Sequence, residues 1–184
     1  MEIKRINGEV SLEKDRKVSG HIPLFRNLLT DGSHYERFAA DSFKTADMSR
    51  CVLALNHNID NACAGTMNDT LRISFDSQGI SWEADIAKTS IGDDTLENVR
   101  SGLANQCSLR FWVAEDDIEI ERGSGQDGLD NVVFNRVHRV LDLAPTPQGA
   151  YSDATYSRMF GGSSGKPRRT SISNSLLFSA LKLI

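Results

Sequence analysis

The chain has 184 residues, 21 Lys and Arg against 25 Asp and Glu, a net charge of −4 and an apolar content of 39%. This length suits one domain, and the recurring apolar residues and low net charge exclude a chain that is disordered throughout. No apolar run reaches the roughly 20 residues of a membrane span, and the first residues lack a signal-peptide pattern. We therefore expect a soluble cytosolic protein, with neither a membrane nor a nucleic acid as partner.

The elements of the first half are predicted from apolar spacing. Aromatic residues at intervals of three to five predict a helix around residues 35–45. Residues 51–55 form a short apolar run, which predicts a buried strand that ends beside His57. Alternating apolar residues in 70–87, interrupted by turn-forming residues at 76–79, predict a β-hairpin.

In the second half, Asp94 and Glu97 have capping-box spacing and predict a helix that ends near Asn105. Residues 107–113 alternate as a strand, whose polar face carries Ser108, Arg110 and Trp112. We interpret the acidic stretch 115–121 as a solvated loop. These elements predict an α+β domain in which sheet dominates and a few helices surround it.

A change of composition near residue 161 indicates the end of the domain. The Gly/Ser-rich residues 161–165 are typical of a flexible linker. Residues 161–184 carry a charge of +4 and no acidic residue, which leaves −8 on residues 1–160. We expect a domain over 1–160, followed by a basic linker and a short amphipathic tail over 161–184.

The sequence offers no clear metal site. None of the four histidines has H-x-H or H-E-x-x-H spacing, and the three cysteines lack C-x-x-C spacing. We therefore expect no metal and no cofactor, and we interpret the cysteines as small buried apolar residues.

A serine and a histidine are the candidates for chemistry. His57 follows a buried strand, and the end of a strand on a rigid sheet fixes the direction of a side chain. Ser108 opens another strand, and its hydroxyl becomes a useful nucleophile only when a nearby base takes its proton. His57 is a suitable base, so we expect the two side chains to meet within hydrogen-bonding distance or slightly beyond it. Each residue alone is also compatible with a structural role.

Three segments, in this order along the chain, resemble blocks of the prohead maturation proteases of tailed phages. These serine proteases are related in fold to the herpesvirus capsid-assembly protease. The segments are residues 53–66 around His57, residues 102–111 around Ser108, and residues 140–151 around Asp142. With weaker similarity at residues 18–21 and 36–43, the resemblance covers about residues 16–155.

The resemblance implies a herpesvirus-protease-like, β-barrel-dominated single domain that works as a serine endopeptidase. Ser108 would be the nucleophile, His57 the general base and Asp142 the group that orients the imidazole. His138 is the alternative third member, after the second histidine of the herpesvirus relatives. Arg139 or Arg136 would support the oxyanion site.

The implied substrates are the major capsid protein, the scaffolding protein and the protease itself, inside a procapsid in the cytoplasm of an infected bacterium. Self-association is also expected. The chain departs from the family pattern at Asn58, where the family has Asp, at Cys107, where it has Met, at Arg110, where it has Gly, and at Asp142, where it has Glu. Asn58 and Arg110 motivate an alternative: a non-catalytic scaffold or assembly protein that retains the protease-like barrel.

Overall fold

The structure is a computed structural model that describes residues 2–147, apart from 13–15, 26 and 31–32. The expected linker and tail over 161–184, and the boundary that precedes them, lie outside the described residues. Within the described part, the molecule consists mainly of β-strands with one α-helix and five short 3-10 helices. The 3-10 helices cover Leu55–His57, Ile59–Asn61, Thr66–Asn68, Glu115–Asp117 and Gln126–Gly128.

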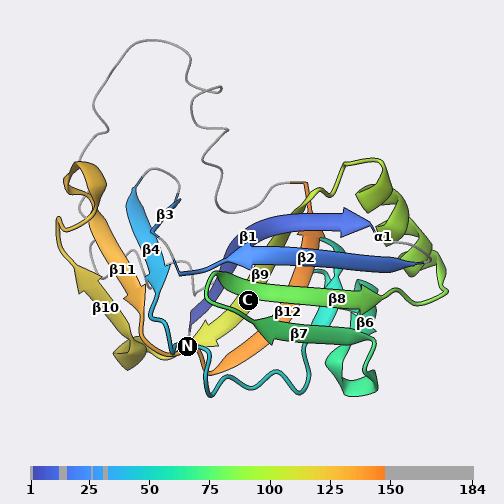
Figure 1. The fold of residues 1–184 in the computed structure, drawn as a ribbon, viewed down its shortest axis with the longest axis horizontal. Helices are drawn as coiled ribbons and strands as arrows, with labels where there is room; N and C mark the ends of the chain where they lie inside the picture. The colour runs from blue at the N-terminus through green and yellow to red at the C-terminus, as the bar shows by residue number, and fades with distance from the viewer. Residues whose placement is uncertain (1, 13–15, 26, 31–32, 148–184) are drawn as a thin grey trace, which may run out of the picture.

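The larger sheet has eight strands in the order β6-β5-β12-β9-β1-β2-β8-β7 (Figure 1). Neighbouring strands are antiparallel except β5 and β12, which are parallel. The strands are β1 (Glu2–Leu12), β2 (Lys17–Pro23), β5 (Val52–Ala54), β6 (Ala62–Gly65), β7 (Leu71–Phe75), β8 (Gly79–Asp85), β9 (Gln106–Val113) and β12 (Arg139–Thr146).

The smaller sheet has four strands in the order β10-β11-β4-β3 and lies at the left of Figure 1. Its strands are β3 (Leu28–Thr30), β4 (His34–Phe38), β10 (Ile118–Glu121) and β11 (Asp130–Phe134). Phe38 and Phe134 of this sheet contact Phe111 of β9, with ring centroids 5.2 Å and 5.5 Å apart. Because aromatic rings bury large apolar areas, these contacts join the two sheets through one core.

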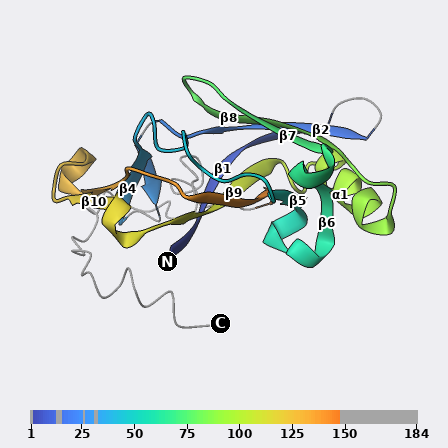
Figure 2. The same cartoon turned by 90° about the horizontal axis from the view of Figure 1, so that it is seen from below.

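The expected β-barrel is not closed within the residues that the structure describes. Figure 2 shows that the larger sheet bends, so that β2, β7 and β8 lie along one side of the molecule and β9 and β12 along the other. Buried side chains from both sides fill the space between them, among them Trp82 of β8 and Leu109 of β9. Closure would require the edge strands β6 and β7 to pair, and no ladder joins them in the described part of the chain. The sheet is therefore open.

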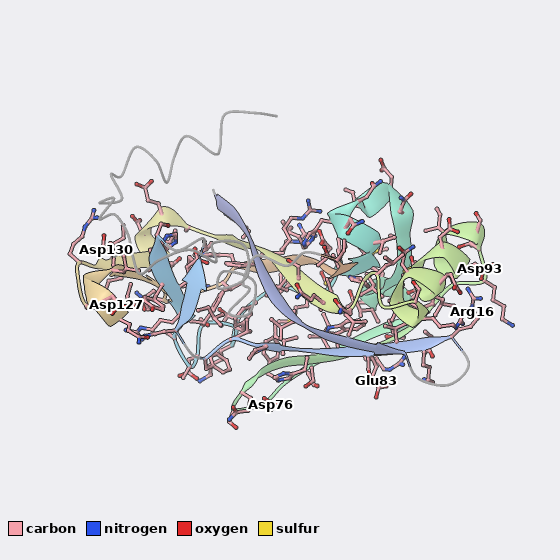
Figure 3. The ribbon with its side chains drawn as sticks, turned by 90° about the horizontal axis from the view of Figure 1, so that it is seen from above. Arg16, Asp76, Glu83, Asp93, Asp127 and Asp130 are labelled. Carbon is pink, nitrogen blue, oxygen red and sulfur yellow. The ribbon has the colours of Figure 1, made fainter. Side chains whose placement is uncertain are left out.

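The hairpin predicted over 70–87 is confirmed as β7 and β8. Its turn is held by Asp76, whose Oδ1 accepts the backbone N–H groups of Gln78 at 2.7 Å and Gly79 at 2.9 Å. These bonds lower the pKa of the Asp76 carboxyl, because they stabilise its charged form. Asp76 lies at the far end of the hairpin from Glu83 (Figure 3).

The predicted helix exists but begins earlier than expected. Helix α1 covers Ser90–Arg100, and its N-cap is Thr89, whose side chain accepts the backbone N–H of Gly92 at 3.1 Å. The start predicted at Asp94 was therefore wrong, because Thr89 provides the cap one turn earlier. Arg16 donates to Asp93 in the first turn of the helix, and the two side chains lie together in Figure 3.

Two other predictions are wrong. The helix expected at 35–45 is instead part of β4 followed by turns, in which the N–H groups of Ser42 and Lys44 bond to the carbonyls three residues earlier. Strand pairing takes the first residues of that range, since Tyr35 is opposite Asn131 and Phe38 is opposite Phe134. The acidic stretch, expected as a loop, contains strand β10, because Ile118 and Ile120 alternate with the acidic residues.

No helix in the described ranges is long and apolar enough to cross a membrane.

Candidate active site

The strand β5 and the turn after it position His57. Val52 is opposite Asp142 and Leu53 is opposite Leu143, so β5 runs beside the middle of β12. Asn56 and His57 then take left-handed backbone conformations, with φ of 56° and 62°. Such conformations are uncommon outside glycine, and a tertiary contact must hold them. Here they turn the chain so that the His57 imidazole reaches β12.

Asp142 holds the imidazole of His57. The Nδ1 nitrogen is hydrogen-bonded to Asp142 Oδ1, and both side chains are buried, with exposed fractions of 6% for His57 and 0% for Asp142. With Asp142 ionised, Nδ1 carries the proton and donates it, which leaves the lone pair of the neutral ring on Nε2. Nε2 is buried and has no hydrogen-bond partner among the described residues.

A β-bulge in β12 turns Asp142 toward His57. Val140 is opposite Phe111 and Asp142 is opposite Arg110, so two steps on β12 match one step on β9 and Leu141 is the extra residue. In a regular strand, Asp142 would share the face of Val140, which is buried in the core. Because of the bulge, Asp142 instead shares the face of Arg110.

Ser108 lies on the same face of the sheet as Asp142. It is opposite Ala144 on β12 and two residues from Arg110 on β9, so its side chain lies on the Arg110 face, away from the core face of Leu109. A residue on one strand and the residue two positions from its opposite partner are about 7–8 Å apart. Ser108 therefore lies near Asp142, the carboxylate that holds His57. Ser108 is 3% exposed. No hydrogen bond joins it to His57 in the described structure, so their contact stays a prediction.

Arg110, which departs from the family pattern, is a further residue of the site. Its Nε donates to Asp142 Oδ2 at 2.6 Å, and its Nη2 forms an ion pair with the same oxygen. A buried carboxylate is costly unless it is paired and hydrogen-bonded, and Arg110 supplies both. The signal was an arginine on the same strand face as Ser108, but its partner could not be known without the register of β12.

His138, the alternative third member, has other partners in the structure. Its Nε2 lies 2.7 Å from Asp117 Oδ2, and its ring packs on Trp112 with centroids 5.1 Å apart. Of the two candidates for the third position, Asp142 is therefore the one that contacts His57.

The arginines expected near the oxyanion site lie before β12 and at its start. Arg139 is opposite Trp112 and faces Asp47, with Nε and Oδ2 3.7 Å apart, whereas Ser108 is opposite Ala144 further along the strand. Arg136 is exposed in the segment between β11 and β12. The described contacts join neither arginine to Ser108.

The cysteines are buried and free, as predicted. Burial raises the pKa of the Cys51 thiol to about 12 and also raises the pKa of Cys107, which precedes Ser108. Since the thiolate is the reactive form, these cysteines are poor nucleophiles near neutral pH. No cluster of three or more His, Cys, Asp or Glu suited to a metal ion occurs among the described residues.

An imidazole held at one nitrogen by a buried carboxylate, with a serine hydroxyl on the same face of the sheet, is an arrangement typical of serine peptidases. The comparisons agree with this class. The family model for the caudovirus prohead serine proteases matches residues 4–163. The chain belongs to this family, whose role is the maturation of phage capsids. A search of curated proteins and a search of solved structures each gave no significant match.

Proposed function

We propose that this protein is an active serine endopeptidase with Ser108 as nucleophile, His57 as general base and Asp142 as the group that orients His57. The observation that carries the proposal is the bond between His57 Nδ1 and Asp142 Oδ1, which leaves the buried Nε2 without a partner. A buried nitrogen that lacks a partner is costly in a structural histidine. It is useful in a base that must accept a proton from a hydroxyl.

The reaction follows from these positions. Ser108 Oγ attacks the carbonyl carbon of the scissile peptide while its proton passes to His57 Nε2, and Asp142 stabilises the imidazolium that forms. Nε2 then gives this proton to the leaving amine, and the C–N bond breaks to leave an acyl-enzyme. A water molecule attacks the ester, again with His57 as base, and releases the acid product and Ser108.

The oxyanion of the tetrahedral intermediate also needs hydrogen-bond donors. Ser108 is opposite Asn7 on β1 and Ala144 on β12, so its backbone N–H points to one of these two neighbouring strands and not to a substrate. Donors must therefore come from other groups once substrate is bound. Arg136 and Arg139 stay our sequence-based hypothesis for that role.

The substrates we propose follow from membership of the family. They are segments of the major capsid protein and of the scaffolding protein, together with the protease itself, and cleavage takes place inside the procapsid in the bacterial cytoplasm. Self-association belongs to the same proposal. The finer likeness of the bent sheet to the herpesvirus capsid protease is likewise a proposal, supported by the order of the three sequence segments.

A fluorophosphonate probe tests the activity without knowledge of the cleavage site. We expect the probe to label the purified protein at Ser108, and labelling to be lost in Ser108→Ala and His57→Ala. Ser74→Ala, an exposed serine on β7, is the matched control and should label like the wild type. A folded wild-type protein that the probe does not label, either free or in assembled procapsids, would favour the non-catalytic assembly protein.

Of the two departures that motivate this alternative, Asn58 has a structural explanation. Its Oδ1 accepts the backbone N–H of Asp60 at 3.2 Å, and it caps the 3-10 helix Ile59–Asn61. An aspartate oxygen can accept the same bond, so the exchange of Asp for Asn keeps this local structure. Arg110 is then the remaining departure that favours the alternative, and the labelling experiment decides between an enzyme and an assembly protein.

A further inference from the structure

We propose that Arg110 is a positioning residue of the active site, which holds the Asp142 carboxylate so that it in turn orients His57. This inference rests on the proposed function. It gives a role to a residue that departs from the family pattern, an arginine in place of glycine two residues after the nucleophile.

The geometry of the carboxylate carries the inference. Nε and Nη2 of Arg110 both contact Oδ2 of Asp142, and Oδ1 is left to His57 Nδ1. Two donors on one oxygen fix the rotation of the carboxylate about its Cβ–Cγ bond, because any turn breaks these contacts. The two oxygens thus have separate tasks: one is anchored and the other accepts from the base.

Burial makes the anchor necessary. Asp142 is fully buried, and its Oδ2 has no other hydrogen-bond partner among the described residues. Without the guanidinium, a buried anion would lose its charge balance on that side and would rotate or shift toward other donors. Either change would weaken the bond that sets the direction of His57.

The frame is also suitable for positioning. Arg110 lies on β9, which is paired on both sides by β1 and β12, and it shares this strand with Ser108. The ion pair therefore crosses from the strand of the nucleophile to the strand of the acid. The Arg110 side chain is 19% exposed. The side chains of the Arg72–Asp85 pair on the outer hairpin are about half exposed, at 44% and 45%. Exposed pairs of that kind contribute little, so Arg72→Met is a matched control.

The charge of the site predicts a particular signature. The charged groups that the described contacts join to His57 are Asp142 and, through it, Arg110. With Arg110 present, the group of three is neutral when His57 is neutral, so protonation of His57 creates a net positive charge. Without Arg110, the same protonation cancels the charge of Asp142. Proton uptake by His57 should therefore become easier, and the base should be lost at higher pH.

The experiment measures the rate of fluorophosphonate labelling at Ser108 as a function of pH. For Arg110→Met we expect a fall of about 10- to 100-fold, the range found when a partner that orients a metal ligand from behind is removed. The acid limb of the pH profile should move to higher pH, and the loss should lie in the maximal labelling rate, not in the affinity for the probe. Arg72→Met should match the wild type in all three respects.

Arg110→Lys keeps the charge but lacks the planar fork. The probe should label this variant more slowly than the wild type, with the acid limb of the pH profile unmoved. The variant replaces Arg110→Met in the test if Arg110→Met does not fold. Circular dichroism and thermal melting check folding in each case. Wild-type rates and pH profiles in folded Arg110→Met, or a wild-type rate in Arg110→Lys, would overturn the inference. If the wild-type protein itself is not labelled, the proposed function fails and the inference falls with it.

Discussion

Val140 and Leu143 are three residues apart on β12, yet both lie in the apolar core. Two positions of a regular strand that are three apart face opposite sides of the sheet. The extra residue Leu141 removes this conflict, and Asp142 is placed on the opposite face of the sheet, between the two core residues in the chain. The bulge thus allows a carboxylate to face His57 from within an apolar strand.

Deletion of Leu141 should remove the bulge but keep Asp142 on the face of Arg110. In the shortened strand Val140, Asp142 and Leu143 alternate, so both apolar residues stay on the core face and Asp142 stays opposite Arg110. We therefore expect a loss of less than about 3 kcal/mol in the free energy of unfolding, measured by urea denaturation, and retained probe labelling at Ser108. Leu141→Ala keeps the residue count and is the control. A loss of labelling as large as that of Asp142→Asn would contradict this account of the bulge.

The two candidates for the third catalytic member can be separated by mutation. Asp142→Asn should lower probe labelling and peptide cleavage on the order of 10³- to 10⁴-fold, since an amide favours the wrong tautomer of His57. Ser108→Ala should lower cleavage by 10⁴-fold or more on the same scale. His138→Ala should have a much smaller effect, because its partners are Asp117 and Trp112. A greater loss in His138→Ala than in Asp142→Asn would support a triad with two histidines.

The left-handed turn before the base predicts a dependence on backbone conformation at Asn56. This side chain is exposed, and its φ is 56°. Asn56→Val should therefore cost about 1–2 kcal/mol of stability, because a β-branched residue fits poorly in the left-handed region. It should also slow labelling at Ser108, since the turn directs His57. Asn56→Gly should retain both properties in thermal melting and probe assays, and equal behaviour of the two variants would contradict this role of the turn.

The buried thiols predict which reagents inactivate the enzyme. Burial raises the pKa of Cys51 to about 12 and also raises that of Cys63. Iodoacetamide at pH 8 should therefore leave all three cysteines unmodified in the folded protein, and it should modify all three in denaturant, as mass spectrometry can measure. Rapid modification of Cys107 in the native state, with loss of activity, would point to a thiol nucleophile instead of Ser108.

The same shift predicts how stability depends on pH in the alkaline range. The Cys51 thiol titrates near its usual value of 9 in the unfolded chain and near 12 in the folded one, so the unfolded state binds fewer protons between these values. Its contribution to stability therefore falls as pH rises through this window. In denaturant titrations at pH 8 and pH 10.5, Cys51→Ala should lose less stability between the two pH values than the wild type does. An equal loss would exclude Cys51 as a cause.

Much of this protein can be derived from its sequence, because local patterns have local causes. Alternation predicted the hairpin β7–β8 and the strand β9, and an apolar run predicted the strand that ends beside His57. The order of three segments pointed to the prohead protease family, which the family comparison confirms. The helix start was missed because two capping signals lie five residues apart, and the side chain of Thr89 is the one that caps the helix.

Tertiary structure decided what depends on contacts between distant segments. The first residues of the helix expected at 35–45 became a strand because residues about 96 positions later pair with them, as Asn131 does with Tyr35. The partner of Arg110 is 32 residues away and lies opposite it only because of the bulge at Leu141. A sequence shows which residues can carry charge or a proton. The register between strands determines which of them meet, because a shift of one residue moves a side chain to the other face of the sheet.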